Sequence, residues 1–276
     1  MLHEGYFDKI YYRFWQSDNE NKNQIILPTI FAIHGLGGHN LWFDNAGEKF
    51  NKRNINFFSF DLPGFGQSKY EKGTINSYKL WLTATHEVFQ EFTDKFKTGS
   101  NIFILGHSLG ALIAIMIKER IQPKGWILSV PGFAGYPKTW PFFSFILPVI
   151  ISSLFNPEKK IILPFGPELL TKNKETQMKV KKDPLRVTNP TSKLFYEVYL
   201  LTLRAKILPR SFNAPVLMLE AGKDFVCSNQ YIDKYFNDIK SKSKSKKVYT
   251  NSSHDLFIED ELEEIVNDIY EWIKQY

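Results

Sequence analysis

The chain has 276 residues, a length that one α/β domain with an insertion can hold. Apolar residues make up 43% and charged residues 23%, which is typical of a globular protein and excludes a disordered one. A net charge of +6 is too small to indicate a partner by itself, but residues 132–210 alone carry +8. Phe, Tyr and Trp reach 16%, which indicates a large aromatic core, an apolar pocket or both.

Cysteine content and apolar runs bear on the compartment. Cys227 is the only cysteine, which excludes an intrachain disulfide and favours a reducing compartment. Residues 1–10 include Glu4 and Asp8 and lack the apolar core of a signal peptide. The longest apolar run, residues 142–155, is shorter than the about 20 residues that span a bilayer. We therefore expect a soluble, cytoplasmic protein that contacts a membrane at most peripherally.

Short apolar runs alternate with helical patterns over the first 130 residues or so, which is typical of a mostly parallel sheet with helices on both faces. The predicted strands in this part are residues 10–15, 25–33, 55–60, 102–105 and 126–130. The predicted helices are residues 42–53, 77–97 and a third that follows Gly110 and ends near Arg120.

The alternation then stops between residues 132 and 210, where prolines from Pro137 to Pro190 break the chain into short pieces. The longest predicted helix there covers residues 189–205. Beyond it we predict a strand at 216–220, a helix at 230–239, a solvated loop at 240–247, a strand at 248–249 and a helix at 259–274. The expected organisation is a core of residues 1–131 and 211–276 with a cap subdomain, 132–210, inserted between the sixth and seventh strands.

The segment Gly106-His107-Ser108-Leu109-Gly110 fits the pattern G-x-S-x-G between a predicted strand and a predicted helix. The sharp strand-to-helix turn strains the serine backbone, and glycines two residues away on either side remove clashing Cβ atoms. The helix N-terminus also directs N–H groups toward the serine. Ser108 is therefore predicted to be a nucleophile, whereas His107, which should point away from it, is predicted to be structural.

A serine nucleophile needs a base, and the base needs an orienting acid. With this motif the chain order is serine, acid, histidine, each following a strand. Asp224 follows the strand at 216–220, and His254 follows the one at 248–249. Asp255 is the rival acid, but adjacent residues rarely bond side chain to side chain, so we expect it to cap the turn into the last helix.

An oxyanion hole needs backbone N–H donors. Leu109, directly after Ser108, supplies one, and Leu36 in the glycine-rich loop 34–39 is predicted to supply the other. That loop lacks the Lys-Ser/Thr ending of a phosphate-binding loop. Asp61 is expected to hold N–H groups of its own turn-rich loop and is assigned no chemistry.

Four segments together resemble the α/β-hydrolase superfamily in order and spacing. They are His34-Gly35-Leu36-Gly37, Asp61-Leu62-Pro63-Gly64-Phe65-Gly66-Gln67-Ser68, Gly106-His107-Ser108-Leu109-Gly110 and Ser253-His254. The acid loop, residues 222–227, and Asp183-Pro184-Leu185 look most like the monoacylglycerol lipase and lysophospholipase branch. The similarity runs from about Ile25 to the C-terminus and is weak across residues 132–176.

This resemblance implies a carboxylic ester hydrolase that uses neither a metal nor an organic cofactor. It makes Ser108 the nucleophile, Asp224 the acid and His254 the base, with Leu36 and Leu109 as oxyanion donors. Leu36 departs from the small or aromatic residues often seen at its position, which a backbone role tolerates.

The cap is where the sequence bears on substrate. Its candidate substrate-binding residues are Trp140, Phe142, Phe143 and Phe145, which either line an acyl tunnel or only pack the cap onto the core. Lysines flank this apolar run at Lys138, Lys159, Lys160 and within 172–182. An apolar wedge with a basic rim suits an anionic membrane surface, although an ordinary solvated face fits equally.

We therefore predict a hydrolase acting on a lipid-like ester, a monoacylglycerol or lysophospholipid, with no nucleic-acid partner. The oligomeric state and transfer to an alcohol other than water stay open. An aminopeptidase of the same fold is the first alternative, but it needs a carboxylate for the substrate's amino group, and lysine predominates in the cap. Its acidic residues are Glu158, Glu168, Glu175, Asp183 and Glu197. The second alternative is a non-catalytic binding protein of the same fold. The loss of a triad residue would indicate it.

Overall fold

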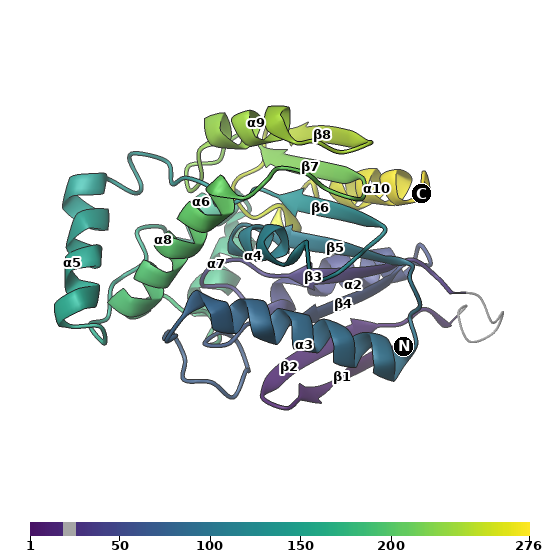
Figure 1. Cartoon of the computed structure of the whole chain (residues 1–276), viewed down its shortest axis with the longest axis horizontal. Coiled ribbons are helices and arrows are strands. Elements are labelled where there is room, and N and C mark those ends of the chain that lie inside the picture. Colours follow the sequence, from purple (N-terminus) through teal and green to yellow (C-terminus); the bar gives the residue numbers. More distant parts are fainter. Residues whose placement is uncertain (19–25) are drawn as a thin grey trace.

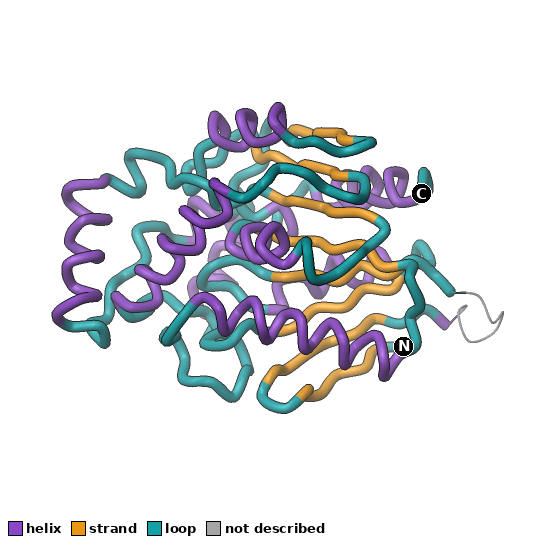
Figure 2. Tube along the Cα trace, in the orientation of Figure 1, coloured by secondary structure: helices purple, strands orange, loops and turns teal. Residues whose placement is uncertain are grey.

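The computed structural model describes residues 1–18 and 26–276, so the first residue of the strand predicted at 25–33 lies outside the described part. Figures 1 and 2 show one central sheet with helices packed on its two faces. In the described residues the sheet has eight strands in the order β1-β2-β4-β3-β5-β6-β7-β8. They are β1 Leu2–Phe7, β2 Ile10–Trp15, β3 Thr29–Ile33, β4 Asn56–Phe60, β5 Ile102–His107, β6 Gly125–Ser129, β7 Val216–Ala221 and β8 Lys244–Tyr249.

Strands β3 to β8 pair in parallel, whereas β1 and β2 form an antiparallel hairpin at the β4 edge. Strand β1 was not predicted, because only Phe7 in this strand is buried and the apolar alternation is correspondingly weak. The inner parallel strands are buried along their whole length, which matches the continuous apolar runs from which they were predicted.

Helices cover both sides of the central strands, as seen in Figure 1. The pair α2 Asp44–Asn51 and α10 Leu262–Ile273 packs on one face. On the other face lie α3 Tyr78–Phe96 and α4 Leu109–Ile117. Helix α9 Asn229–Asp238 also belongs to the core and packs against β7. The predicted mostly parallel sheet with helices on both faces is confirmed.

Aromatic side chains fill the core between the β4 side of the sheet and α3. Phe58 lies 5.0 Å from Phe31 and 4.2 Å from Phe92 between ring centroids, and Phe14 meets Phe92 edge-on at 5.1 Å. Such pairs contribute about 0.5–1.5 kcal/mol each beyond the area they bury. Part of the high aromatic content therefore belongs to the core.

Local capping sets the two ends of α3. Ser77 precedes α3 and accepts a hydrogen bond from the Lys79 N–H, and the helix ends where Lys97 adopts a left-handed conformation. The helix predicted at 42–53 is instead a 3₁₀ turn, Asn40–Phe43, followed by α2. The helix predicted at 259–274 is α10, and a short 3₁₀ turn, η3 Leu256–Ile258, precedes it.

The loop predicted at 240–247 is partly wrong, because β8 begins at Lys244. This strand lies at the edge of the sheet and pairs only with β7 among the described strands. Lysines on an edge strand keep the open backbone from pairing with another chain, so a Lys/Ser run is compatible with this position. Lys246 also forms ion pairs with Glu220 and Asp233, which anchor the polar strand.

A helical insertion, residues 130–215, separates β6 from β7 and lies beyond the carboxyl ends of the parallel strands, on the left in Figure 1. Its elements are a π-helical turn η2 Phe142–Ile146, then α5 Leu147–Phe155, α6 Pro167–Leu170, α7 Lys174–Lys182 and α8 Ser192–Ile207. In the described residues, no helix combines the length and apolarity needed to cross a membrane.

Polar contacts fasten the insertion to the core. Asp183 accepts hydrogen bonds from the Trp42 indole and the Leu185 N–H, and its carboxylate lies 2.7 Å from His39 Nε2. These partners hold the Asp183 carboxylate in its charged form, so its pKa is lowered despite burial. At the other end, the buried Glu197 carboxylate of α8 accepts the Tyr78 N–H at the start of α3. The insertion is thus attached at several points around the ends of the parallel strands.

Candidate active site

Ser108 occupies a sharp turn between β5 and α4 with φ 53° and ψ −110°. The two flanking glycines are required by close backbone approach. A Cβ on Gly106 would lie 2.5 Å from the Gly110 carbonyl oxygen, and one on Gly110 would lie 2.1 Å from the Ile33 carbonyl oxygen. The local geometry is therefore the strained strand-to-helix turn that the motif predicts, with the Ser108 hydroxyl at the carboxyl end of the sheet.

Three residues far apart in sequence meet at this turn. His254 Nε2 lies 3.0 Å from Ser108 Oγ, and His254 Nδ1 lies 2.9 Å from Asp224 Oδ2. Asp224 follows β7, and His254 follows β8, so the parallel order of the strands brings both to the end of β5. All three side chains are buried. The structure thus brings together the three residues singled out as nucleophile, acid and base.

The Asp224 carboxylate is held in a fixed orientation. Its Oδ1 accepts the N–H groups of Val226 and Cys227 at 2.7 and 2.8 Å, which leaves Oδ2 for His254. Burial disfavours the charged imidazolium of His254, but the charge and hydrogen bond of Asp224, with the charge of Asp255, outweigh it and raise the pKa of His254. The site is therefore electrostatically suited to holding a proton on His254.

The loop after β3 lies against the serine. A Cβ on Gly35 would come within 3.2 Å of Ser108 Cβ, so Leu36 is positioned beside the turn. His34 accepts the Leu62 N–H at its Nε2, and its other ring nitrogen lies 2.8 Å from the Gly35 carbonyl oxygen. In the described residues neither the Leu36 nor the Leu109 N–H donates to a backbone carbonyl. Both amides suggested for an oxyanion hole are thus available next to Ser108.

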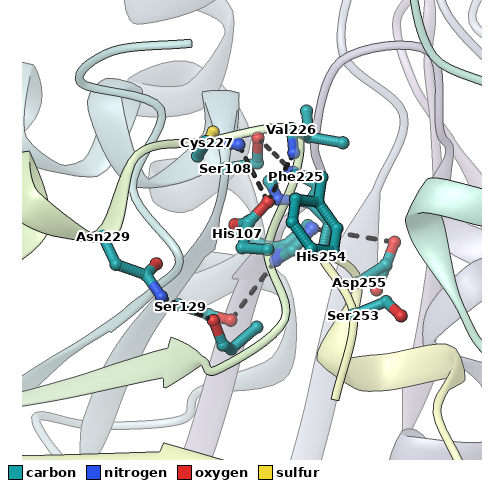
Figure 3. A network of polar contacts seen from close by, with 12 residues as sticks. His107, Ser108, Ser129, Phe225, Val226, Cys227, Asn229, Ser253, His254 and Asp255 are labelled. Atoms are coloured by element: carbon teal, nitrogen blue, oxygen red, sulfur yellow. Dashed lines mark hydrogen bonds and ion pairs between the residues drawn. The ribbon is translucent and has the colours of Figure 1, made fainter. Parts of the chain in front are cut away.

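His107 and Asp255 form a buried pair behind His254, as Figure 3 shows. His107 Nδ1 lies 3.3 Å from Ser129 Oγ, and its Nε2 lies 3.6 Å from Asp255 Oδ2. Asp255 accepts the Phe257 N–H and so caps η3, the short turn before the last helix, as expected. Burial raises the pKa of Asp255 to about 6. His107 also lines the cavity beside Ser108, which its structural interpretation did not include.

Asp224, Cys227 and His254 place three potential metal-ligand atoms within 4.8 Å of one another. Two of these groups already bond each other, and Asp224 also accepts two backbone N–H groups. Burial and the neighbouring Asp224 charge raise the pKa of the Cys227 thiol well above its ordinary value, so the thiol stays protonated. These donors therefore suit proton transfer with Ser108 better than metal binding.

Glu259 is a positioning residue that the sequence analysis missed. Its buried carboxylate accepts the N–H of Ser253, directly before His254, and also the Thr171 hydroxyl and the Lys172 N–H at the end of α6. The His254 N–H donates to the Leu169 carbonyl, which adds a backbone contact between the same two loops. The insertion therefore supports the histidine loop directly.

A cavity of about 260 Å³ opens beside Ser108 between the core and the insertion. Trp140, Phe142 and Phe145 line it, as the sequence analysis suggested for cap residues. Phe143 does not line it and is instead 81% exposed. Phe142, Phe145 and Val149 recur at helical spacing along η2 and α5 and share the side that faces the cavity, whereas Phe143 lies off that side. The second part of the aromatic content therefore belongs to an apolar pocket.

Helix α8 supplies a wall of the cavity that the sequence analysis did not single out. Phe195, Tyr199, Thr202 and Lys206 recur at helical spacing and share one face that lines the cavity. This spacing was readable in the sequence, but which face of α8 meets Ser108 depends on how the insertion folds back.

The eight-stranded, mostly parallel sheet, the strained serine turn and the Ser-His-Asp arrangement together define an α/β-hydrolase. The family described as serine aminopeptidase, S33, matches residues 26–261, and the chain belongs to this family. It is thus a serine hydrolase, and the predicted enzyme class is confirmed.

Curated relatives agree with the predicted branch. The chain is 26% identical to a phospholipase, YtpA, of Bacillus subtilis, over 95% of this chain and 98% of that protein. It is 24% identical to the monoglyceride lipase of Homo sapiens, over 96% of this chain and 87% of that protein. The resemblance to the monoacylglycerol lipase and lysophospholipase branch is confirmed.

Solved structures agree in fold. The chain superimposes on a soluble variant of monoglyceride lipase from Saccharomyces cerevisiae, crystallised with a substrate analogue, with a TM-score of 0.86. The two are 19% identical, and the match covers 100% of this chain and 95% of that one. The monoacylglycerol lipase of Paleococcus ferrophilus matches with a TM-score of 0.80 and 23% identity, over 96% and 98% of the two chains.

Proposed function

We propose that this protein hydrolyses the carboxylic ester of a single-chain lipid, a monoacylglycerol or lysophospholipid, with Ser108, His254 and Asp224 as its catalytic triad. The observation that carries the proposal is the buried hydrogen-bonded chain from Ser108 through His254 to Asp224, which faces an apolar cavity. The relatives named monoglyceride lipase and phospholipase support the substrate class.

In the proposed reaction His254 Nε2 takes the Ser108 proton as Oγ attacks the ester carbonyl carbon. The negative charge that forms on the carbonyl oxygen is stabilised by the N–H groups of Leu36 and Leu109. His254 then gives its proton to the departing alcohol, and an acyl-enzyme on Ser108 remains. A water molecule, deprotonated by His254, attacks the acyl carbon, and His254 returns this proton to Ser108 Oγ as the acyl–oxygen bond breaks and the fatty acid leaves. Asp224 stabilises the imidazolium in both steps.

Residues 132–210 act in this proposal as a cap that encloses the acyl chain. Trp140, Phe145 and Phe195 support this role, because their rings gather within 5.7–6.1 Å of one another on the cavity wall. Burying a chain of methylene groups against such a wall is favourable by about 0.8 kcal/mol for each CH₂. Length selectivity then depends on where this aromatic cluster closes the cavity.

The aminopeptidase alternative lacks a group to hold a substrate ammonium. Among the described residues, Asp255 is the one carboxylate that lines the cavity, and it already accepts the Phe257 N–H and faces His107. The acidic residues of the insertion do not line the cavity. The half-buried ammonium of Lys206 does, and would repel a cationic substrate.

The outer surface of the insertion supports a peripheral contact with an anionic membrane. Phe143 and Phe155 are 81% and 85% exposed, and Leu154 and Ile162 are also exposed. Lys159 and Lys160, which lie between Phe155 and Ile162 in the chain, are exposed as well. Exposed apolar side chains next to lysines suit the interface of an anionic bilayer, from which a single-chain lipid substrate would enter.

The proposal is tested with the full chain on monoacylglycerols, lysophospholipids and graded short-chain esters, beside Ser108→Ala. We expect turnover of the lipid esters, covalent labelling of the wild type by a fluorophosphonate, and neither with Ser108→Ala. Ser253→Ala is a control, because this serine is buried nearby but its hydroxyl is outside the triad. Labelling that persists in Ser108→Ala, or no turnover of any acyl ester, would contradict the proposal.

A further inference from the structure

Helix α8 carries a gradient of polarity along the face that lines the cavity. The face begins with Phe195, continues through Tyr199 and Thr202, and ends with Lys206. At 1.5 Å per residue, about 16 Å separates its two ends along the helix axis. Phe195 meets the aromatic cluster of Trp140 and Phe145, so the N-terminal end of this face is fully apolar. The cavity is therefore amphipathic along its length.

Lys206 is a cation without a counter-charge. Among the described residues it is the one Lys or Arg that lines the cavity, and no carboxylate lies within ion-pair distance of its Nζ. Its ammonium lies 4.9 Å from the centroid of the Tyr231 ring. Lys193 on the same helix, in contrast, pairs with Glu197. A half-buried ammonium with no carboxylate nearby is unfavourable in its charged form. An anionic group of the substrate would remove this cost in free energy.

The position of Lys206 relative to Ser108 follows from Thr202. The Thr202 hydroxyl lies 3.5 Å from the Gly132 carbonyl oxygen, and the Gly132 N–H donates to the Ser108 carbonyl at 3.2 Å. Lys206 is one helical turn, about 6 Å, beyond Thr202 on the side away from the aromatic cluster. Along this helix the part of the cavity next to Ser108 thus has the apolar Phe195 on one side and the cationic Lys206 on the other.

We propose that Lys206 binds the phosphate of the substrate's head group and makes the site selective for anionic lysophospholipids over neutral monoacylglycerols. The inference rests on the proposed hydrolysis of a lipid ester and specifies its substrate. A glycerol backbone separates ester from phosphate in such a lipid, in keeping with one turn of helix between Thr202 and Lys206. The ammonium donates hydrogen bonds to phosphate oxygens, and its contact with the face of the Tyr231 ring holds it in place.

The test compares kcat/KM on three substrates with one acyl chain: a lysophosphatidylglycerol, a lysophosphatidylcholine and a monoacylglycerol, each in neutral detergent micelles. Lys206→Gln should lower kcat/KM on the anionic lipid by about tenfold and leave the neutral one nearly unchanged. Lys206→Arg should retain most of the preference. Arg204→Gln is the matched control, because Arg204 is an exposed cation of α8 that does not line the cavity.

Equal loss on all three substrates in Lys206→Gln, or the same selective loss in Arg204→Gln, would overturn the role of Lys206. Added salt should weaken the wild-type preference, because it screens a half-exposed charge pair. A second measurement does not depend on turnover: calorimetric binding of decyl phosphate and of decanol to the full chain. Lys206→Gln should weaken decyl phosphate binding about tenfold and spare decanol. Unchanged binding of decyl phosphate by Lys206→Gln would overturn the inference even if ester hydrolysis is confirmed. Weaker binding of decyl phosphate but not of decanol would support the inference even if no lipid ester is turned over.

Discussion

The Thr171 hydroxyl donates a hydrogen bond of 2.8 Å to the carboxylate of Glu259. Thr171 directly follows α6 in the insertion, and Glu259 follows the short turn after His254. The same carboxylate accepts the Ser253 N–H, so one buried acidic side chain connects the insertion to the residue that precedes the proposed base. The conformation of the histidine loop therefore depends on the insertion as well as on the core.

Replacing Glu259 with Ala should destabilise the protein and misplace His254. Three donors, the Thr171 hydroxyl and the N–H groups of Ser253 and Lys172, would lose a buried acceptor. We expect a loss of about 2–3 kcal/mol in the free energy of unfolding, measured with urea, and a lower kcat. Thr171→Val removes one of these bonds and should cost about 1 kcal/mol. A Glu259→Ala variant with wild-type kcat would show that this carboxylate does not position the histidine.

The Asp224 carboxylate can be tested with a nearly isosteric change. In Asp224→Asn the amide oxygen can still accept the Val226 and Cys227 N–H groups, but the amide nitrogen then faces His254 Nδ1. The His254 ring must then adopt its other tautomer, with the proton on Nε2. This nitrogen can no longer accept the Ser108 proton. We expect kcat to fall by about a thousandfold or more with little change in stability. In Asp255→Asn, kcat should fall far less. A larger loss of kcat in Asp255→Asn than in Asp224→Asn would instead make Asp255 the orienting acid.

The pH dependence of turnover should follow His254. The imidazole must be neutral to accept the Ser108 proton, and the pKa of His254 is raised above its ordinary value of 6.5. Activity should therefore increase as pH rises through that higher pKa and be lost below it. Asp224, Asp255 and His107 face this ring.

Since the Asp255 charge contributes to the raised pKa, Asp255→Asn should move the acidic limb of the kcat profile to lower pH. Asp238→Asn, an exposed carboxylate of α9, should leave the limb in place. A limb that stays unchanged or moves to higher pH in Asp255→Asn would contradict this electrostatic assignment.

Features encoded by consecutive residues could be predicted from the sequence. The turn at residues 106–110 was one, because the glycines and the flanking strand and helix are adjacent in the chain. Asp224 and His254 could be named because each follows a strand, and parallel strands end at the same edge of a sheet. The polar edge strand β8 was recognised only at its last two residues, because lysine and serine carry no apolar alternation.

Features that depend on how distant segments pack could not be predicted. Glu259 reads as an ordinary acidic residue near a helix start, and its role depends on α6 lying beside the histidine loop. Phe142 and Phe143 look alike in the sequence, yet the first lines the cavity and the second faces solvent. Lys206 is one of many lysines in the sequence, and its position at the cavity depends on how α8 packs.

The glycines around Ser108 should differ sharply in their tolerance of alanine. A Cβ on Gly110 would meet backbone atoms of Ile33 and His34, which cannot move without disturbing β3. A Cβ on Gly132, by contrast, would find its nearest neighbours at 3.6 Å, an ordinary contact. Gly110→Ala should therefore lower the free energy of unfolding by about 3 kcal/mol or prevent folding, whereas Gly132→Ala should cost less than about 1 kcal/mol. Equal free energies of unfolding for the two variants, measured with urea, would contradict the close approach of Gly110 to the Ile33 backbone.

The exposed aromatic residues of the insertion should matter only when substrate is presented in a bilayer. A double variant, Phe143→Ser with Phe155→Ser, removes two large apolar side chains that are 81% and 85% exposed. Neither ring lines the cavity, so hydrolysis of a soluble short-chain ester should stay near the wild-type rate. Sedimentation with anionic vesicles should fall, because each lost ring gives up about 1.5–3 kcal/mol of possible apolar burial. Val248→Ser on the distant edge strand β8, also an exposed apolar residue, should leave vesicle binding intact. Equal vesicle binding by the wild type and the double variant would mean that this surface is only a solvated face of the insertion.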